Sequence, residues 1–189
     1  MLLLVESHRW AQVLGMRWNI DASHSTAEFT VRHLMITNVK GRFSKLTGSA
    51  DFDPAHPDGG SFEATIDVDS IDTRDEKRDA HLKSGDFFDA AKFPTIAFKS
   101  KKVAKSDDGY SATGDLTIHG VTKEVTLEIE ELSKPGKDPW GNTRVGASAH
   151  TKINRKDFGL GWNQALETGG VLVGEQVKIS LEVSMVQAG

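Results

Sequence analysis

The strongest pattern in the sequence is an alternation of apolar and polar residues with a period of two. Residues 177–185 give the clearest example, because every second side chain there is apolar and those between are polar. Successive side chains of a β-strand point to opposite faces, so the alternation predicts strands with one buried and one exposed face. The same pattern recurs at residues 27–33, 62–68, 110–118 and 125–129.

Weaker alternating runs and a short segment near Trp18 bring the expected total to about eight strands. These runs cover residues 42–52, 95–103 and 145–153. Residues 106–109 and 119–122 predict tight turns, whereas the prolines and glycines of residues 53–60 and 134–141 predict longer loops. Short links join antiparallel neighbours, since parallel strands need long crossovers. The fold class expected is therefore all-β and antiparallel.

A sheet with one apolar face must cover that face, and closure into a barrel does so without leaving exposed edges. We therefore expect an eight-stranded antiparallel β-barrel. An interior of that size is either filled by side chains or holds one ligand. Small residues at inward positions favour a cavity, whereas large residues opposite them would fill the space: Ala27, Ala64, Ala112, Gly114, Ala147 and Ala149. Both alternatives stay open at this point.

Two stretches break the alternation. Residues 75–84 are charged, with an apolar pair inside, and predict a short helix that Asp72 or Thr73 could cap. Residues 157–175 are rich in glycine and long enough to form a flap or lid. The barrel is thus expected to carry one or two short helices.

Composition narrows the function classes. The 189 residues include no cysteine, which excludes disulfides and thiolate chemistry, and the formal net charge of −4 argues against a nucleic-acid partner. The apolar run at residues 1–5 is far shorter than a membrane helix. We expect residues 1–15 to be an extension before a native start at Met16, residues 16–187 to form a single domain, and the protein to be cytoplasmic without stable membrane insertion.

Several ordered motifs carry a family resemblance. They are DASHSTAEFTVRHL at 21–34, VKGRF at 39–43, DSIDT at 69–73, RDAHL at 78–82, DFFD at 86–89, FPT at 93–95, GDLTIHGVT at 114–122, INR at 153–155 and DFG at 157–159. From Trp18 to about Val186 the chain resembles the YceI-like polyisoprenoid-binding proteins. The resemblance implies a lipocalin-like eight-stranded barrel whose apolar pore holds a polyisoprenoid, such as a quinone tail, or another long amphiphile.

With that resemblance, the inward apolar residues become candidates for the wall of a lipid site, although each also fits an ordinary core. They are Phe29, Val31, Phe43, Ile66, Phe98, Leu116, Ile118, Leu127, Ile179 and Leu181. His33 shares an apolar face and could meet a polar head group or be a structural histidine, and Trp162 with Asn163 could cap the barrel. Arg42, Arg74 and Arg78 could bind a head group or pair with nearby aspartates.

No motif in the sequence demands catalysis. The histidines His24, His33, His81, His119 and His150 lack a metal-ligand spacing, and neither a nucleophile elbow nor a phosphate loop is present. We therefore expect a lipid carrier with no catalytic residue, metal or cofactor, bound only to its isoprenoid or lipid ligand. Two alternatives are a lipid-modifying enzyme that uses His33 or His119, and a filled barrel acting through its surface in stress response. A homodimer is compatible with the sequence.

Overall fold

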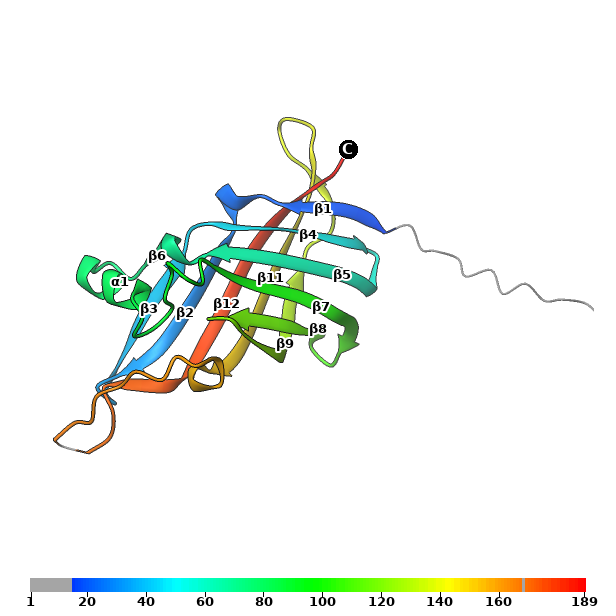
Figure 1. The fold of residues 1–189 in the computed structure, drawn as a ribbon. Helices are drawn as coiled ribbons and strands as arrows, with labels where there is room; N and C mark the ends of the chain where they lie inside the picture. Colours follow the sequence, from blue (N-terminus) through cyan, green and yellow to red (C-terminus); the bar gives the residue numbers. More distant parts are fainter. Residues whose placement is uncertain (1–14, 168) are drawn as a thin grey trace, which may run out of the picture.

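Eight strands close into an antiparallel barrel. The computed structural model describes residues 15–167 and 169–189. Each strand of the ring pairs with two neighbours, in the order β1, β4, β5, β7, β8, β9, β11, β12 and back to β1 (Figure 1). Their bounds are Met16–Ile20, Leu46–Asp53, His56–Asp67, Thr95–Ser106, Gly109–Ile118, Val121–Leu132, Thr143–Asn154 and Val173–Gln187. The predicted fold class is confirmed. The predicted extension over residues 1–15 lies, apart from Gly15, outside the described residues.

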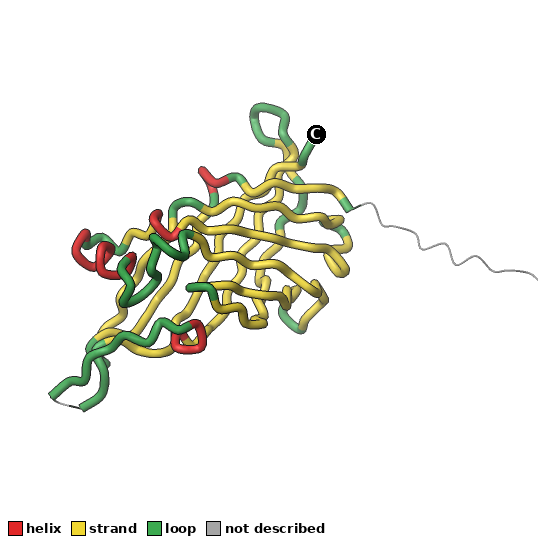
Figure 2. The backbone as a smooth tube through the Cα atoms, in the orientation of Figure 1, coloured by secondary structure: helices red, strands yellow, loops and turns green. Residues whose placement is uncertain are grey.

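Other described strands extend the sheet beyond the ring. They are β2 (Thr26–His33), β3 (Thr37–Phe43) and β6 (Ile71–Asp72), which follow one another from β12, and β10 (Gly136–Lys137) beside β11. The helical segments lie at the ends of strands (Figure 2). They are α1 (Glu76–Lys83) and the 3-10 turns η1 (Ala22–His24), η2 (Val68–Ser70) and η3 (Arg155–Phe158). Within the described residues, no helix has the length and apolar character needed to cross a membrane.

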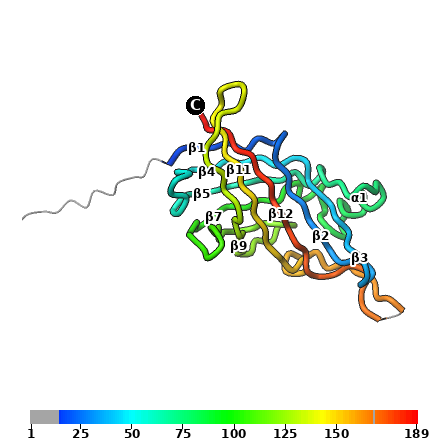
Figure 3. Tube along the Cα trace, turned by 180° about the vertical axis from the view of Figure 1, so that it is seen from behind, coloured from blue at the N-terminus to red at the C-terminus, as the bar shows by residue number. Residues whose placement is uncertain are grey.

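Strand β12, with 15 residues, connects the ring to the extension. Its last residues pair with β1 and residues 173–182 pair with β2, while its other edge pairs with β11 from Gln176 to Val186. Figure 3 shows β12 running between β11 and β2. The alternation has the predicted consequence, because Ile179 and Leu181 line the interior whereas Lys178 and Ser180 are exposed.

Two local predictions were wrong. Asp75, rather than Asp72 or Thr73, caps α1, because its carboxylate accepts hydrogen bonds from the first helical N–H groups. Residues 53–60 are mostly strand: β4 ends at Asp53 and β5 begins three residues later, so the turn is short. The surplus residues form a bulge, since Asp53 pairs with His56 but Asp51 pairs with Ser61.

A small buried apolar cluster packs around Trp18 of β1. Trp18 is fully buried, and its indole N–H donates to the Phe52 carbonyl at 3.2 Å. The two rings lie 5.7 Å apart between centroids, and Ala50, Val145 and Met185 complete the cluster. Burial of both the ring and its N–H donor fixes β1 against β4, as a buried tryptophan requires.

A charged cluster on Arg144 of β11 joins the loop before β11 to the link between β1 and η1. Arg144 donates from Nε to Asp138 at 2.7 Å and from Nη1 to Asp21 at 2.6 Å. The Arg144 guanidinium holds the pKa of Asp138 well below its usual range. Hydrogen bonds from Ser23, and next from Arg144, do the same for the pKa of Asp21.

The Arg144→Gln variant should unfold at a lower urea concentration than the parent at pH 7, and the difference should shrink below about pH 4. Carboxylates with depressed pKa values stabilise the fold above their unfolded-state pKa of about 4 and lose that contribution as the pH falls. Urea titrations at several pH values measure this. Arg17→Gln, which removes an exposed pair with Asp51, should have little effect at any pH. A pH-independent deficit in Arg144→Gln would mean that the cluster acts through packing alone.

Candidate functional site: two apolar chambers inside the barrel

Apolar side chains surround a cavity of about 150 Å³ beside α1, which we call the helix-side chamber. All ten apolar wall residues predicted from the alternation line it: Phe29, Val31, Phe43, Ile66, Phe98, Leu116, Ile118, Leu127, Ile179 and Leu181. Polar side chains contribute only Glu28, Thr151 and Arg155 to its lining. An apolar cavity of about this size stays dry in other proteins and takes up apolar guests.

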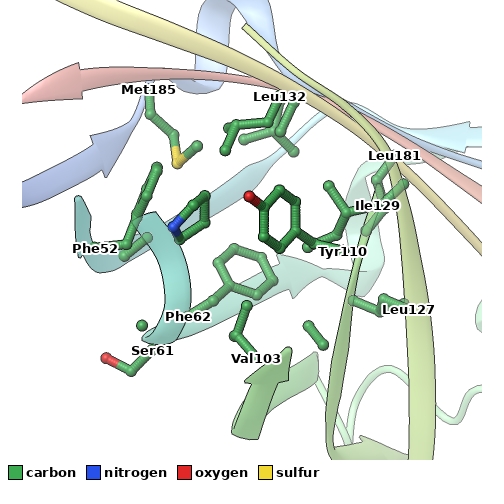
Figure 4. Close-up of a pocket in the computed structure, with 17 residues that line it drawn as sticks. Phe52, Ser61, Phe62, Val103, Tyr110, Leu127, Ile129, Leu132, Leu181 and Met185 are labelled. Atoms are coloured by element: carbon green, nitrogen blue, oxygen red, sulfur yellow. The ribbon is translucent and has the colours of Figure 1, made fainter. Parts of the chain in front are cut away.

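A second cavity of about 90 Å³ lies toward the β4–β5 and β7–β8 hairpins, and we call it the hairpin-side chamber (Figure 4). Its lining is apolar except for Ser61 and Tyr110. Tyr110, the only tyrosine of the chain, directs its hydroxyl into this chamber, as Figure 4 shows. The chamber can therefore hold a second apolar segment with one hydrogen-bonding group beside it.

The two chambers meet at a waist of four shared side chains: Phe62, Leu127, Leu181 and Val183. The Phe62 ring packs on that of Phe98, with centroids 5.8 Å apart. Because every waist residue is apolar, a flexible hydrocarbon chain meets no polar barrier between the chambers. The interior is thus two apolar volumes in series along the barrel.

Small residues create the space. Ala27 and Ala64 line the helix-side chamber, whereas Ala112, Ala147 and Ala149 line the hairpin-side chamber. Gly114 has a different role: a Cβ there would lie 2.3 Å from the Lys99 carbonyl oxygen, so the glycine permits close approach of β7 and β8. The alternative of a completely filled interior is therefore not the arrangement in this structure.

Two segments, one at the end of α1 and one after η3, border one part of the helix-side chamber, and we call this part of its lining the mouth. Leu82 of α1 and the following Phe87 and Phe88 form one side, and Leu160 and Val173 form the other. The second pair belongs to the segment 160–174, which we call the flap. Its described part folds back on itself: Asn163 donates from Nδ2 to the Val173 carbonyl and accepts from its N–H, at 2.7 and 3.0 Å.

Hydrogen bonds from Arg155 connect the flap to the barrel. Arg155 is only 3% exposed, and its guanidinium donates to the backbone carbonyls of Leu160, Trp162, Val173 and Gly174. Burial lowers the pKa of Arg155 from its ordinary value, yet an arginine stays charged at neutral pH. One buried cation therefore satisfies carbonyls from both ends of the flap.

An aromatic cluster connects the flap to the opposite side of the mouth. The Trp162 ring lies 4.7 Å from His81 and 5.3 Å from Phe87 between centroids, and His81 and Phe87 lie 5.1 Å apart. Phe87 lines the chamber, but Trp162 does not. Trp162 thus lies one layer outside the wall, in contact with a residue that forms it.

The remaining predicted polar contacts are spread over the surface. His33 ends β2 opposite Val173 of β12 and is not among the lining residues. Arg42 pairs with Asp72 at 3.1 Å, and Arg78 donates to the carbonyl of Thr73 at 2.7 Å. Arg42 and Arg78 are therefore better explained as partners of Asp72 and Thr73 within the fold than as ligands of a lipid head group.

The five histidines considered as candidates lie in separate places. His24, His81 and His150 lie within 3.2 Å of carboxylate oxygens, on Asp21, Asp86 and Glu130 respectively. His119 lies in the β8–β9 turn against the ring of Phe93, 4.7 Å away. In the described ranges, no group of three histidine, aspartate or glutamate side chains lies close enough together to hold a metal ion.

Sequence reasoning missed much of the mouth. Its residues come from helix α1, the turn η3, loops and the first residue of β12, where no period-two alternation indicates which side chains face inward: Leu82, Phe87, Phe88, Arg155, Leu160 and Val173. Arg155 and Phe87 were noted only as parts of family motifs. The short apolar runs in those motifs are the one signal that could have indicated them.

Fold and interior together define a class: antiparallel β-barrels that enclose an apolar chamber. Within this class, the chain belongs to the YceI-like domain family, which matches residues 18–185. The family expected from the sequence motifs is therefore confirmed.

Similar proteins agree with this assignment. A UPF0312 protein of Staphylococcus aureus is 41% identical over 162 residues, covering 85% of this chain and 92% of its own length. The crystal structure of Burkholderia cenocepacia BcnA has a TM-score of 0.75 and 26% identity, covering 87% and 98% of the two chains. A polyisoprenoid-binding domain from Saccharophagus degradans, implicated in plant cell wall breakdown, has a TM-score of 0.66 over 92% and 99%; at 14% identity it shows the shared fold alone.

Proposed function

We propose that this protein is a carrier that binds one long apolar chain, such as a polyisoprenoid tail, through the helix-side chamber and into the hairpin-side chamber. The observation that carries the proposal is the pair of apolar chambers in series, joined by an apolar waist. A linear hydrocarbon chain fits two narrow volumes in series better than a compact ligand does.

The energetics favour an occupied interior. An unfilled cavity costs about 24 cal/mol per Å³, so a volume of 150 Å³ left empty costs roughly 3–4 kcal/mol. A bound chain removes that cost and gains about 0.8 kcal/mol for each methylene-sized group it buries. The polyisoprenoid-binding domain of Saccharophagus degradans, which shares the fold, makes a prenyl tail the first ligand to test.

A binding role accounts for the interior better than catalysis does. An acid or base must lie within hydrogen-bond reach of the reacting group. His33 and His119, the candidates for a lipid-modifying enzyme, line neither chamber. The proposed role is therefore that of a carrier, which releases its ligand chemically unchanged.

Mass spectrometry of protein purified from its own host tests the proposal. Native spray should show a stoichiometric adduct, and an organic extract should identify a prenylated species, such as a quinone. The same protein after delipidation is the control, and it should regain the adduct when prenyl lipid is added. A clean apo mass that added prenyl lipids do not change would refute the isoprenoid assignment.

A further inference from the structure

The β2–β3 turn exposes three large apolar side chains in a row. Leu34, Met35 and Ile36, which we call the apolar tip, are 38%, 50% and 73% exposed. Leu34 and Met35 have φ angles of 53° and 63°, in the left-handed region that non-glycine residues rarely adopt. Asparagine and glycine suit such a turn better, so the tip combines exposed apolar surface with backbone strain.

The apolar tip adjoins the mouth of the helix-side chamber. The Leu34 N–H donates to the Leu172 carbonyl in the flap at 2.8 Å. The next flap residue, Val173, lines the chamber. Figures 1 and 3 both show the β2–β3 turn and the flap projecting together, at the end of the molecule away from the loop 133–142. The backbone of the tip is thus hydrogen-bonded to the flap one residue before the chamber wall.

A row of lysines crosses the outer face of the sheet behind the tip. Lys40 of β3 pairs with Thr30, Thr30 with Lys178 of β12, and Lys178 with Lys152 of β11. All three lysines, which we call the lysine row, are exposed. Lys40 lies four residues from Ile36, or about 13 Å along a strand.

The lysine row is electrostatically unfavourable by itself. Like charges directly opposite one another on neighbouring strands destabilise a sheet, and Lys178 lies directly opposite Lys152. Among the described residues, the nearby ion pairs are Arg42–Asp72 and Lys156–Glu175, which do not include the lysine row. Two further acidic residues lie in this region, Glu28 and Glu167 of the flap. Glu28 is exposed on the same face of β2, two residues from Thr30 and therefore diagonal to Lys40 and Lys178, and offsets part of the repulsion. An anionic surface would relieve the repulsion.

We infer that the apolar tip and the lysine row form a docking surface for an anionic lipid bilayer. The tip enters the acyl boundary while the lysines reach the phosphate groups, which is the usual combination in proteins that bind at a membrane surface. The chamber mouth then faces the bilayer, so a prenyl chain transfers without crossing water. The biological purpose of this docking rests on the proposed carrier function. The docking itself can be tested without it.

Vesicle sedimentation tests the surface with the whole chain. The protein should bind vesicles of phosphatidylcholine mixed with phosphatidylglycerol, bind phosphatidylcholine alone weakly, and dissociate in high salt, which screens the lysine row. Met35→Ser/Ile36→Ser and Lys152→Glu/Lys178→Glu should each weaken binding to the mixed vesicles about tenfold or more. The matched controls at the far loop, Trp140→Ser and Lys134→Glu/Lys137→Glu, should bind like the parent.

Three results would overturn the inference. The first is that the parent does not bind the mixed vesicles, and the second is that the control variants lose as much binding as the test variants. The third is that the parent is a dimer and Met35→Ser/Ile36→Ser is a monomer, which would mean that a second copy covers the tip. Uptake of prenyl lipid from detergent, measured by native mass spectrometry, separates the two proposals. If the parent binds vesicles but takes up no prenyl lipid, the carrier function fails and the docking surface stands.

Discussion

Val183→Trp should weaken binding of a long prenyl alcohol such as solanesol about 100-fold or more, while geraniol binds almost as it does to the parent. Val183 lines both chambers, so an indole there obstructs the waist and keeps a long chain out of the hairpin-side chamber. Each methylene-sized group excluded costs about 0.8 kcal/mol, so one lost isoprene unit suffices for such a change. Competition with a fluorescent prenyl probe measures both affinities.

Ser180→Trp is the matched control, because it adds the same ring to the exposed face of the same strand. Its affinity for solanesol should equal that of the parent. If Val183→Trp stays folded by circular dichroism and binds both alcohols as the parent does, the chain does not pass the waist. The proposed arrangement of the ligand in two chambers would then be wrong.

Arg155→Met should detach the flap from the barrel. The variant loses charged hydrogen bonds to four backbone carbonyls, each typically worth about 1.5–3 kcal/mol. Water can solvate some of these carbonyls once the flap opens, so we expect a net loss of about 3 kcal/mol in the free energy of flap opening. The dissociation of a bound prenyl chain should accelerate accordingly, since the flap forms one side of the mouth.

Hydrogen exchange measures this opening directly. The Leu34 amide donates to the Leu172 carbonyl of the flap, and the Leu172 amide donates to the Gln164 carbonyl within the flap. Both amides should exchange about 100-fold faster in Arg155→Met. Barrel amides such as that of Ile179 should keep their protection. Lys156→Met is the control: it removes the next side chain of η3, a half-exposed partner of Glu175, and should leave the flap closed. Uniformly faster exchange would show that Arg155 stabilises the whole barrel instead.

The sequence alone determined the barrel and much of its wall. A period-two pattern is local information, because neighbouring side chains of a strand face opposite sides whatever the strand pairs with. For this reason Phe29, Val31, Ile179 and Leu181 could be placed on the inner face without a structure, and they line the helix-side chamber. The short links at residues 106–109 and 119–122 likewise predicted antiparallel neighbours correctly.

Only the tertiary structure decided whether the interior is empty and how it opens. The alanines permitted either a cavity or a filled core, and the choice depends on which large residues lie opposite them across the barrel. The roles of Arg155 and Trp162 depend on a flap whose contacts are long-range and whose sequence has no period.

The lysine row shows the same limit. Lys40, Lys152 and Lys178 are far apart in the chain, and each is an ordinary exposed residue of its own strand. They become neighbours only through the register of β3, β2, β12 and β11. Periodicity decides which face of a strand is buried, but strand pairing decides which residues share that face, and pairing is a property of the whole folded sheet.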